Sequence, residues 1–343
     1  MRISVVIPAY NAAETIKACL ASLYKQSLLP SEIIVVDNNS TDNTGEIVTQ
    51  FFNNHKNVPS FYLHEKRQGP SFARNCGAKK ASGDIIAFID ADCIAESTWL
   101  HNINKSFDNP KVGAVTGSII GYEKDTMIGK FHALFTMREL PESRLFNEFN
   151  LLSGGFPTAH FSIKKCLFDE IGGFDEALPI YSEDYDLCAR IYAAGHAINY
   201  NKKVMVFHQH RHSLTSTWRQ SYGFGTGHGT LLKKHFHRMV IIEAPRFRYI
   251  TTRWPLRIWL DMASADKKLI LFVALSIIYW YFIFILLLFI ILLYLDVGRR
   301  TNNDQVCADI FEKCGIIFLL FFKSMAITAG RLASSLRHGV ICF

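Results

Sequence analysis

Residues 85–92 have the sequence Ile-Ile-Ala-Phe-Ile-Asp-Ala-Asp, an apolar run that ends in two carboxylates one residue apart. Such a run predicts a buried strand with Asp90 and Asp92 at its carboxyl end, the edge where open α/β sheets bind ligands. Two carboxylates so close repel each other unless a cation lies between them, and Mg²⁺ is often shared between such groups and substrate phosphates. The stretch therefore predicts a site for a metal and a diphosphate, and a polar loop that only closes the strand is the alternative.

The rest of the N-terminal third alternates strand-like and helix-like segments. The strand-like runs lie at residues 3–8, 32–37 and 61–64, and the segments with helical spacing lie at 15–25 and about 44–52. Alternation of this kind predicts a parallel, doubly wound sheet. Asp37 ends the second run, so Asp37 and Asp92 are expected on one rim of the sheet.

Several segments of the chain carry a family resemblance. They are Val5–Asn11 (VVIPAYN), Ile34–Asp42 (IVVDNNSTD), Gly69–Asn75 (GPSFARN), Phe88–Asp92 (FIDAD), Gly172–Glu176 (GGFDE) and Ser182–Leu187 (SEDYDL). In this order and spacing they resemble the inverting glycosyltransferases of family 2, over about residues 3–230. The resemblance implies the GT-A fold, an α/β doubly wound mixed sheet, and a nucleotide-diphosphate sugar as donor. It also implies a divalent metal, Mg²⁺ or Mn²⁺, and inversion at the anomeric carbon.

The same resemblance implies roles for individual residues. The implied donor-binding residues are Pro8, Ala9, Tyr10, Asn11 and Asp37 around the base and ribose, with Gly69, Arg74, Asp90 and Ala91 completing the set. Asp92 is implied as a metal ligand, with Asp90 at the metal or at the ribose. Asp184 is implied as the general base, with Glu183 beside it. Many relatives have a second aspartate where this chain has Asn38, which leaves the base open, and a UDP-sugar is the first expectation.

The adjacent acids Glu183 and Asp184 can also be considered by their chemistry alone. A single displacement needs one base to take the proton of the acceptor hydroxyl. Neighbouring side chains diverge on a helix, and Asp186 would pair there with Arg190, four residues on. The alternative is that these acids only begin a helix over 185–194, where negative charge suits the helix macrodipole.

Three histidines alternate after the strand-like run 203–207. A site made of histidines alone would favour zinc, but no cysteine or acid lies near enough in sequence to complete one. We expect His208 to join Asp92 on the donor metal, as in some relatives of the family, and His210 and His212 not to be ligands. The alternative is that neutral imidazoles contact phosphate or solvent.

The glycine-rich stretch 223–229 does not have the spacing of a dinucleotide-binding motif and is not followed by a βαβ unit. We expect it to form a mobile loop over the donor. Processive members of the family carry a Gln-x-x-Arg-Trp motif near this point, whereas this chain has the order Trp218-Arg-Gln220. The order favours transfer of one sugar per encounter over polymerisation.

Basic residues crowd the segment before the apolar tail. The 343-residue chain has a net charge of +7, and residues 233–268 contain nine lysines and arginines against three acids, with aromatic residues interleaved. This composition suits an anionic membrane surface. Nucleic acid is the alternative partner for such a segment, and the apolar stretch that follows decides against it.

Residues 269–295 contain no charged side chain. As one helix they would be about 40 Å long, more than the hydrocarbon core of about 30 Å, which predicts a transmembrane helix and an integral membrane protein. The basic flank predicts that the catalytic domain is cytoplasmic. A second apolar stretch at about 315–330, interrupted by Lys323, is expected to cross again or to lie in the interface. Met1 leads straight into the first strand, so no signal peptide is expected, and the eight cysteines without a Cys-x-x-Cys motif fit a reducing compartment.

These features together predict the organisation and function of the chain. The expected parts are a nucleotide-sugar-binding half at 1–115, an acceptor-binding and catalytic half at 116–232, a basic aromatic interfacial segment at 233–268, a membrane helix at 269–295, and a loop, second membrane helix and tail at 296–343. The expected acceptor is membrane-associated, such as a lipid-linked glycan or a polyprenyl carrier. The alternatives are a processive polysaccharide synthase, a nucleotidyltransferase, and a non-catalytic sugar-binding scaffold, which would be expected to lack Asp92 or Asp184.

Overall fold

The chain folds into two compact units, which are described separately. The computed structural model describes residues 1–121, 125–136, 140–149, 155–178, 181–209, 213–244, 247–251, 256–262, 264–303, 306 and 308–343. The first unit consists of residues 1–122 and 137–209, and the second unit consists of residues 123–136 and 210–343.

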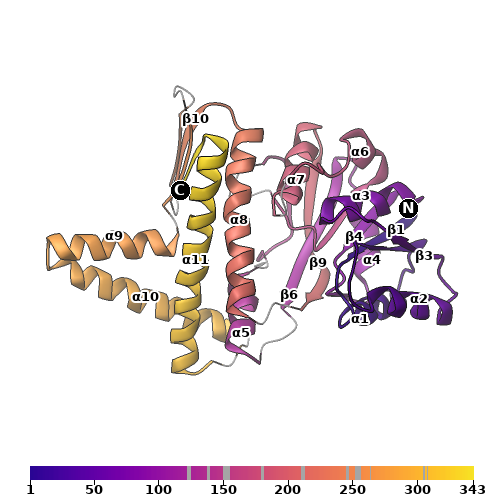
Figure 1. The fold of residues 1–343 in the computed structure, drawn as a ribbon, viewed down its shortest axis with the longest axis horizontal. Helices are drawn as coiled ribbons and strands as arrows, with labels where there is room; N and C mark the ends of the chain where they lie inside the picture. The colour runs from indigo at the N-terminus through magenta and orange to yellow at the C-terminus, as the bar shows by residue number, and fades with distance from the viewer. Residues whose placement is uncertain are drawn as a thin grey trace. The chain divides into compact units, whose positions relative to one another are not determined.

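The first unit is built on a nine-stranded mixed sheet (Figure 1). Its strands are β1 (Ile3–Ala9), β2 (Glu32–Asp37), β3 (Ser60–His64), β4 (Ile85–Ile89), β5 (Cys93–Ala95), β6 (Val112–Gly121), β7 (Arg144–Phe146), β8 (His160–Lys164) and β9 (Ala197–His208). They follow the order β3-β2-β1-β4-β8-β6-β9-β5, with β7 paired to β9. Strands β1 to β4 are parallel, and β8 runs antiparallel to β4 and β6. The predicted α/β mixed sheet is therefore confirmed.

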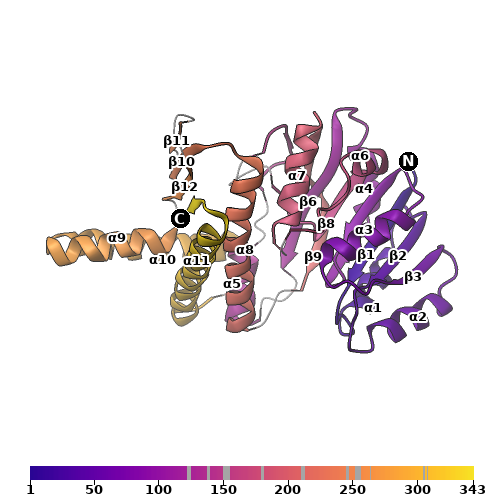
Figure 2. The same cartoon turned by 45° about the horizontal axis from the view of Figure 1, so that its top comes forward.

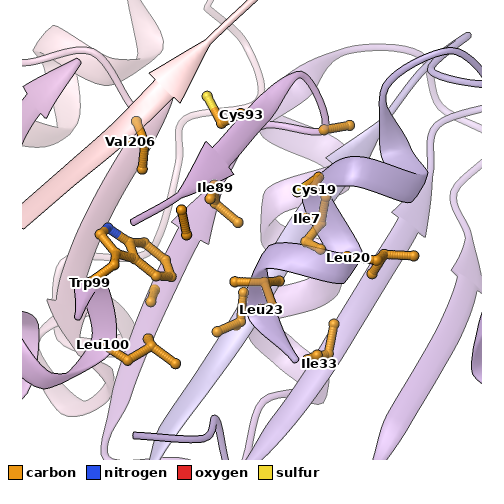
Figure 3. Packing of buried hydrophobic residues seen from close by; sticks show 14 of the residues in the cluster. Ile7, Cys19, Leu20, Leu23, Ile33, Ile89, Cys93, Trp99, Leu100 and Val206 are labelled. Atoms are coloured by element: carbon orange, nitrogen blue, oxygen red, sulfur yellow. The ribbon is translucent and has the colours of Figure 1, made fainter. Parts of the chain in front are cut away.

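Helices cover both faces of this sheet because the β1 side chains alternate between two apolar clusters. Val5 and Ile7 belong to one cluster and Val6 to the other, as the period of two in a strand requires. Figure 3 shows the first cluster, where Leu20 and Trp99 pack with residues of the sheet. The helices of this unit are α1 (Ile16–Leu23), α2 (Thr44–Asn54), α3 (Pro70–Lys80), α4 (Trp99–Ser106), α6 (Lys165–Glu170) and α7 (Glu183–Ala193).

The second unit combines long helices with a small sheet (Figure 2). Its helices are α5 (Met127–Phe135), α8 (Leu214–His235), α9 (Ala265–Ile278), α10 (Phe282–Asn303) and α11 (Ile310–His338). Its strands are β10 (Met239–Ala244), β11 (Phe247–Thr251), β12 (Arg257–Asp261) and β13 (Ile341–Cys342), in the order β11-β10-β12-β13. Part of the segment 233–268, predicted as interfacial, thus forms the strands β10, β11 and β12 of this sheet.

The glycine-rich stretch 223–229 lies inside α8, so the predicted mobile loop is wrong. A methyl group built on Gly225 would lie 2.1 Å from the carbonyl oxygen of Ile327, and one built on Gly330 would lie 2.1 Å from the carbonyl oxygen of Tyr222. Helices α8 and α11 therefore meet backbone to backbone. Small residues permit such an approach, and this packing outweighs the low helix propensity of glycine.

The predicted single helix over 269–295 is also wrong. The structure has two helices there, α9 and α10, separated by a turn at Tyr279–Tyr281 (Figure 1). Among the described residues, one helix, Phe282–Asn302, is long and apolar enough to cross a membrane by length and composition. Only 6% of its most apolar 18-residue stretch is buried in the protein. The second predicted membrane helix, 315–330, falls within the longer helix α11.

Candidate active site

The carboxyl ends of β1, β2 and β4 meet at one rim of the first unit's sheet, because β1 is parallel to both neighbours. The structure places Asp37 at the end of β2 and Asp90 directly after β4. Asp37 is only 5% exposed. One of its carboxylate oxygens accepts from the backbone N–H of Ser40 at 2.8 Å, and the other from the Tyr62 hydroxyl at 2.6 Å. The strand ends thus meet as predicted, with Asp90 rather than the predicted Asp92 directly after β4. The two bonds of Asp37 fix the orientation of its carboxylate.

The donor-binding residues predicted in the first rim loop stand at the end of β1. Pro8 and Ala9 are still in the strand, and Tyr10 follows with half of its surface exposed. Asn11 adopts a φ of +48°, and its side-chain oxygen accepts from the backbone N–H of Thr41 at 2.8 Å. This bond joins the loops after β1 and β2.

The hydrogen bonds of Asn38 explain why this chain has an amide at a position where many relatives have an acid. Its side-chain nitrogen donates to the carbonyl oxygens of Glu65 at 3.2 Å and Arg67 at 2.7 Å. Its side-chain oxygen accepts from the backbone N–H of Gly69 at 2.7 Å. A carboxylate cannot donate the first two bonds, so Asn38 fastens the loop that leads into α3.

Arg74 connects the rim to the predicted catalytic acids. Gly69, with a φ of +144°, ends the preceding loop, and α3 then carries Arg74 inward, where it is 5% exposed. Its guanidinium contacts an Asp90 oxygen at 3.0 Å and a Glu183 oxygen at 3.2 Å. Burial lowers the pKa of Arg74, but the charges of Asp90 and Glu183 outweigh burial and raise it. The guanidinium is therefore a permanent cation between two acids.

Asp184 lies at the start of α7, beside this ion-pair cluster. One of its carboxylate oxygens accepts from the backbone N–H of Tyr185 at 2.8 Å. Burial, together with the nearby charge of Glu183, raises the pKa of Asp184 to about 8. A carboxyl group with such a pKa can exchange a proton near neutral pH, as a general base requires.

Backbone strain precedes the two acids. Tyr181 has a φ of +80°, a conformation that a residue with a bulky side chain seldom adopts. Strain of this kind persists only where the surroundings impose it, and it clusters at functional sites. The predicted pair of Asp186 and Arg190 is confirmed farther along α7, with the Arg190 Nε 2.8 Å from an Asp186 oxygen.

A candidate metal site lies where β5 pairs with β9. The ligand atoms of Asp92, Cys93 and His208 all lie within 4.8 Å of one another. The His208 Nε2 is 3.5 Å from an Asp92 oxygen. His208 is the last residue of β9 rather than the first residue beyond it, and it pairs in register with Cys93. Asp90, predicted at the metal or at the ribose, contacts Arg74 with one carboxylate oxygen. His210 and His212 lie outside the described residues.

Cys93 is the member of this cluster that sequence reasoning missed. It is fully buried, and burial together with the charge of Asp92 raises the pKa of its thiol well above the usual value. The thiol therefore stays protonated and donates weakly to an Asp92 oxygen at 3.8 Å. The signal in the sequence is faint, because only the cross-strand register brings Cys93 beside His208.

The glycine-containing segment 172–176 is fastened to α3. The side-chain nitrogen of Asn75 donates to the carbonyl oxygen of Phe174, and the side-chain oxygen of Asn75 accepts from the N–H of the same residue, both at 2.9 Å. Arg67 adds an ion pair with Glu176 at 2.9 Å. The segments GPSFARN and GGFDE, far apart in the sequence, thus form one part of the site.

Comparisons with known proteins agree with this geometry. The model of the family described as Glycosyl transferase family 2 matches residues 4–172. The chain is 30% identical over 212 residues to the glycosyltransferase AglE of Haloferax volcanii, which covers 61% of this chain and 67% of that protein. It is 25% identical over 344 residues to the probable glycosyltransferase YdaM of Bacillus subtilis, which covers 94% of this chain and 79% of that protein.

Among solved structures, the mannosyltransferase PcManGT from Pyrobaculum calidifontis, in complex with GDP-Man and Mn²⁺, resembles this chain with a TM-score of 0.58. The identity is 18%, over 97% of this chain and 86% of that one, so the likeness concerns the fold. It supports the GT-A fold that the sequence predicts. The family match and the relatives show that the chain is a glycosyltransferase and belongs to glycosyl transferase family 2.

Proposed function

We propose that this glycosyltransferase moves one sugar from a nucleotide-diphosphate donor to a membrane-associated acceptor, with inversion and in a single displacement. The observation that carries the proposal is the half-buried carboxyl of Asp184, whose pKa is raised to about 8 beside the cluster of Arg74, Asp90 and Glu183. A base with such a pKa can take a proton from a sugar hydroxyl and return it to water.

The donor would lie along the rim of the first unit's sheet. The exposed ring of Tyr10 offers an apolar face to a nucleotide base, and Asp37 lies at the end of the neighbouring strand. Gly69 and Ala91 would border the donor at the ends of their loops. A UDP-sugar is our first expectation, and a GDP-sugar is the second because PcManGT was solved with GDP-Man.

Asp92 and His208 would hold a divalent metal, with Cys93 adjacent. Their ligand atoms are close enough to share one ion, and a carboxylate with an imidazole suits Mn²⁺ at least as well as Mg²⁺. Such an ion would neutralise the charge that develops on the leaving diphosphate. The Cys93 thiol would keep the Asp92 carboxylate in place by its hydrogen bond.

The remaining residues position the base and the acceptor. Arg74 forms ion pairs with Glu183 and Asp90. Of the adjacent acids Glu183 and Asp184, Asp184 is therefore the one that Arg74 does not bind directly. Asp184 would take the proton of the acceptor hydroxyl. At the same time the hydroxyl oxygen of the acceptor would attack the anomeric carbon, and the bond from that carbon to the diphosphate would break. The α3-bound segment 172–176 would form the acceptor side.

The second unit supports a membrane-associated acceptor, such as a lipid-linked glycan or a polyprenyl carrier. Its helices α9 and α10 expose large apolar side chains along most of their length. The segment 233–268 is rich in basic residues, which favour an anionic, cytoplasmic surface. Attachment there would place the reaction beside lipid-borne substrates.

Purified full-length protein tests the proposal in mixed micelles that contain polyprenyl phosphate or a lipid-linked sugar. UDP-, GDP- and dTDP-sugars are supplied with Mn²⁺ or Mg²⁺, and products are identified by mass and anomeric configuration. We expect one donor to yield a singly glycosylated lipid of inverted configuration. A ladder of products would show a processive synthase, and failure to bind any nucleotide sugar would contradict the proposal.

A further inference from the structure

The hairpin of α9 and α10 exposes an apolar surface that the protein leaves uncovered. No side chain from Lys268 to Asp296 is buried, and Ile277 and Trp280 are 82% and 73% exposed. Soluble monomers seldom expose continuous apolar patches larger than a few hundred Å². An apolar partner must therefore cover this surface.

The turn of the hairpin is suited to a medium without water. The backbone N–H of Tyr279 donates to Leu275 at 2.7 Å, that of Phe282 to Tyr279 at 3.0 Å, and that of Ile283 to Trp280 at 3.1 Å. Because lipid cannot satisfy backbone groups, few donors can be left open within a bilayer. The hydrogen bonds continue almost without interruption from one helix to the next.

The interior of the hairpin is equally free of unpaired charge. The charge-free stretch runs from Leu269 to Leu295. The Ser276 hydroxyl donates to the carbonyl oxygen of Phe272 at 2.7 Å, within its own helix. The rings of Phe272 and Phe289 meet across the two arms at 5.4 Å. Both arms can thus face hydrocarbon without a charged side chain and with the Ser276 hydroxyl satisfied.

The charge-free part of each arm is shorter than the hydrocarbon core of a membrane. The charge-free part of α9 from Leu269 to Ile278 is about 15 Å long, and that of α10 from Phe282 to Leu295 is about 21 Å long. The hydrocarbon core is about 30 Å thick, so one leaflet contributes about 15 Å. The tip at Tyr279–Tyr281 would reach the middle of the bilayer and turn back.

Both ends of the hairpin attach to α11. At the start of α9, Asp266 accepts hydrogen bonds from Ser324 and Thr328 of α11. Near the end of α10, Val297 packs in one apolar cluster with Ile316 of α11. Since both ends rest on one helix of the second unit, they lie on the same side of any membrane that the tip enters.

Basic residues at both ends of the hairpin and an apolar face on α11 indicate where the surface of a membrane would lie. Lys267 and Lys268 precede the charge-free stretch, and Arg299 and Arg300 follow it. Helix α11 exposes apolar side chains at seven-residue intervals, which lie on one face of a helix; they are Phe311, Phe318, Met325 and Leu332. A helix with such a face and basic neighbours suits the headgroup region.

We propose that α9 and α10 form a re-entrant hairpin that enters one leaflet of a lipid bilayer and returns, with α11 lying in the headgroup region. The partner is the acyl region beneath anionic headgroups. This inference goes beyond sugar transfer and does not depend on the donor or acceptor. It replaces the membrane-crossing helix expected from the sequence.

The side of the membrane on which α10 ends gives the first test. The full chain with Asn302→Cys is treated in sealed vesicles with a membrane-impermeant maleimide, and each labelled peptide is identified by mass. Native Cys166, exposed in the first unit, reports the side of that unit. We expect the introduced thiol and Cys166 to be labelled together or protected together until detergent is added. Opposite labelling would show a crossing and overturn the proposal.

The depth of Trp280 gives the second test. Wild-type protein and Trp280→Phe are reconstituted into lipids brominated at different depths, and the difference in fluorescence quenching isolates Trp280. We expect the largest fractional loss with bromines near the ends of the acyl chains. Strongest quenching near the headgroups would place the tip at a surface, and no quenching would indicate a protein partner such as a second copy; both would overturn the proposal.

A charge at the tip gives the third test, which does not depend on spectroscopy. Trp280→Lys should lower the ratio of vesicle-bound to free protein at least about tenfold, because a charge in the bilayer core is strongly unfavourable. The matched control is Leu29→Lys, which changes an exposed apolar residue of the first unit and should leave this ratio unchanged. Equal binding of both variants would overturn the proposal. No transfer assay is involved, so these results are separate from the donor question.

Discussion

Arg74 holds together residues that the sequence separates widely. Asp90 follows a strand, and Glu183 begins a helix more than ninety residues later, yet both contact one guanidinium. Arginine suits this position because its planar group can bind two carboxylates in fixed directions. Arg74 thus fixes Glu183, the residue directly before Asp184 in α7.

Removal of the Arg74 charge should destabilise the first unit. Arg74→Gln leaves Glu183, which is 5% exposed, without its cation. Breaking a buried ion pair on one side costs about 3–5 kcal/mol in the free energy of unfolding. Urea unfolding would measure the loss, and the double variant Arg74→Gln/Glu183→Gln should recover part of it. Equal stability of wild type and Arg74→Gln would show that this pair does not stabilise the fold.

The pH dependence of transfer should report Asp184. Because the base acts in its deprotonated form and its pKa is about 8, kcat/KM should rise with pH and level off above about 8. Asp184→Asn should reduce kcat/KM by about 10²–10⁴-fold and remove this rise. The control Asp169→Asn, on the exposed side of α6, should keep the wild-type profile. A rise that persists in Asp184→Asn would assign the base to another group.

Metal affinity should depend on His208 as well as on Asp92. Metal affinity is measured by titrating Mn²⁺ into the protein and following the electron paramagnetic resonance signal. The measurement does not need an assay of sugar transfer. Loss of a residue that merely orients a metal ligand weakens metal binding about 10–100-fold. His208→Asn removes a proposed ligand itself, so Mn²⁺ affinity should fall by at least that factor. His101→Asn is a control outside the cluster. Unchanged Mn²⁺ binding in His208→Asn would exclude this imidazole as a ligand.

Some residues of the site could be predicted from the sequence and others could not. The ends of β2 and β4, which carry Asp37 and Asp90, meet at one rim as predicted, because apolar strands that alternate with helices determine which ends meet. Cys93 could not be found, because a single cysteine beside an acid has no ligand spacing of its own. The partners of Arg74 were missed for the same reason, since they arise from contacts between distant elements.

At the scale of elements, α8 and α11 illustrate how packing overrides local preference. Alternate glycines predict a loop, because glycine is a poor helix former. In the structure Gly225 and Gly330 let two backbones touch, so their lack of side chains stabilises the pair. Pattern analysis of one helix cannot detect this, because the reason lies in a segment about a hundred residues away.

Enlargement of Gly225 should separate these helices. Gly225→Ala would place a methyl group against the backbone of Ile327, and overpacking of this kind typically costs about 1–3 kcal/mol. Gly298→Ala is the matched control in α10, where the added methyl group meets open space. We expect a lower melting temperature in detergent for Gly225→Ala and no decrease for Gly298→Ala. The same melting temperature for both would contradict close packing at this contact.

The break between α9 and α10 shows a second limit of sequence analysis. The turn at Tyr279–Tyr281 contains neither glycine nor proline, and the surrounding residues form an unbroken apolar run. Composition therefore predicted a single helix. Two isoleucines and four aromatic residues in succession have only moderate helix propensity, a signal too weak to place a turn without the structure.

At the scale of the whole molecule, the hairpin should dominate membrane attachment. The full chain should remain in the membrane pellet after washes with high salt and with alkaline carbonate, because buried apolar surface is not screened by ions. A variant in which residues 269–295 are replaced by a short glycine-serine linker should be released by salt. Immunoblots of pellet and supernatant would measure both. Release of the full chain by carbonate alone would show that the attachment is peripheral.

The membership of α5 in the second unit has a consequence for synthesis. Its residues Phe131 and Leu134 pack with Ile316 and Leu319 of α11. At about 5–20 residues per second, the ribosome would complete α11 roughly ten to forty seconds after it completes α5. During that interval the hairpin of α9 and α10 emerges while its support on α11 is still missing. In newborn chains the apolar side chains of α5 that later pack on α11 therefore stay exposed. We expect a chaperone to contact the chain at this helix.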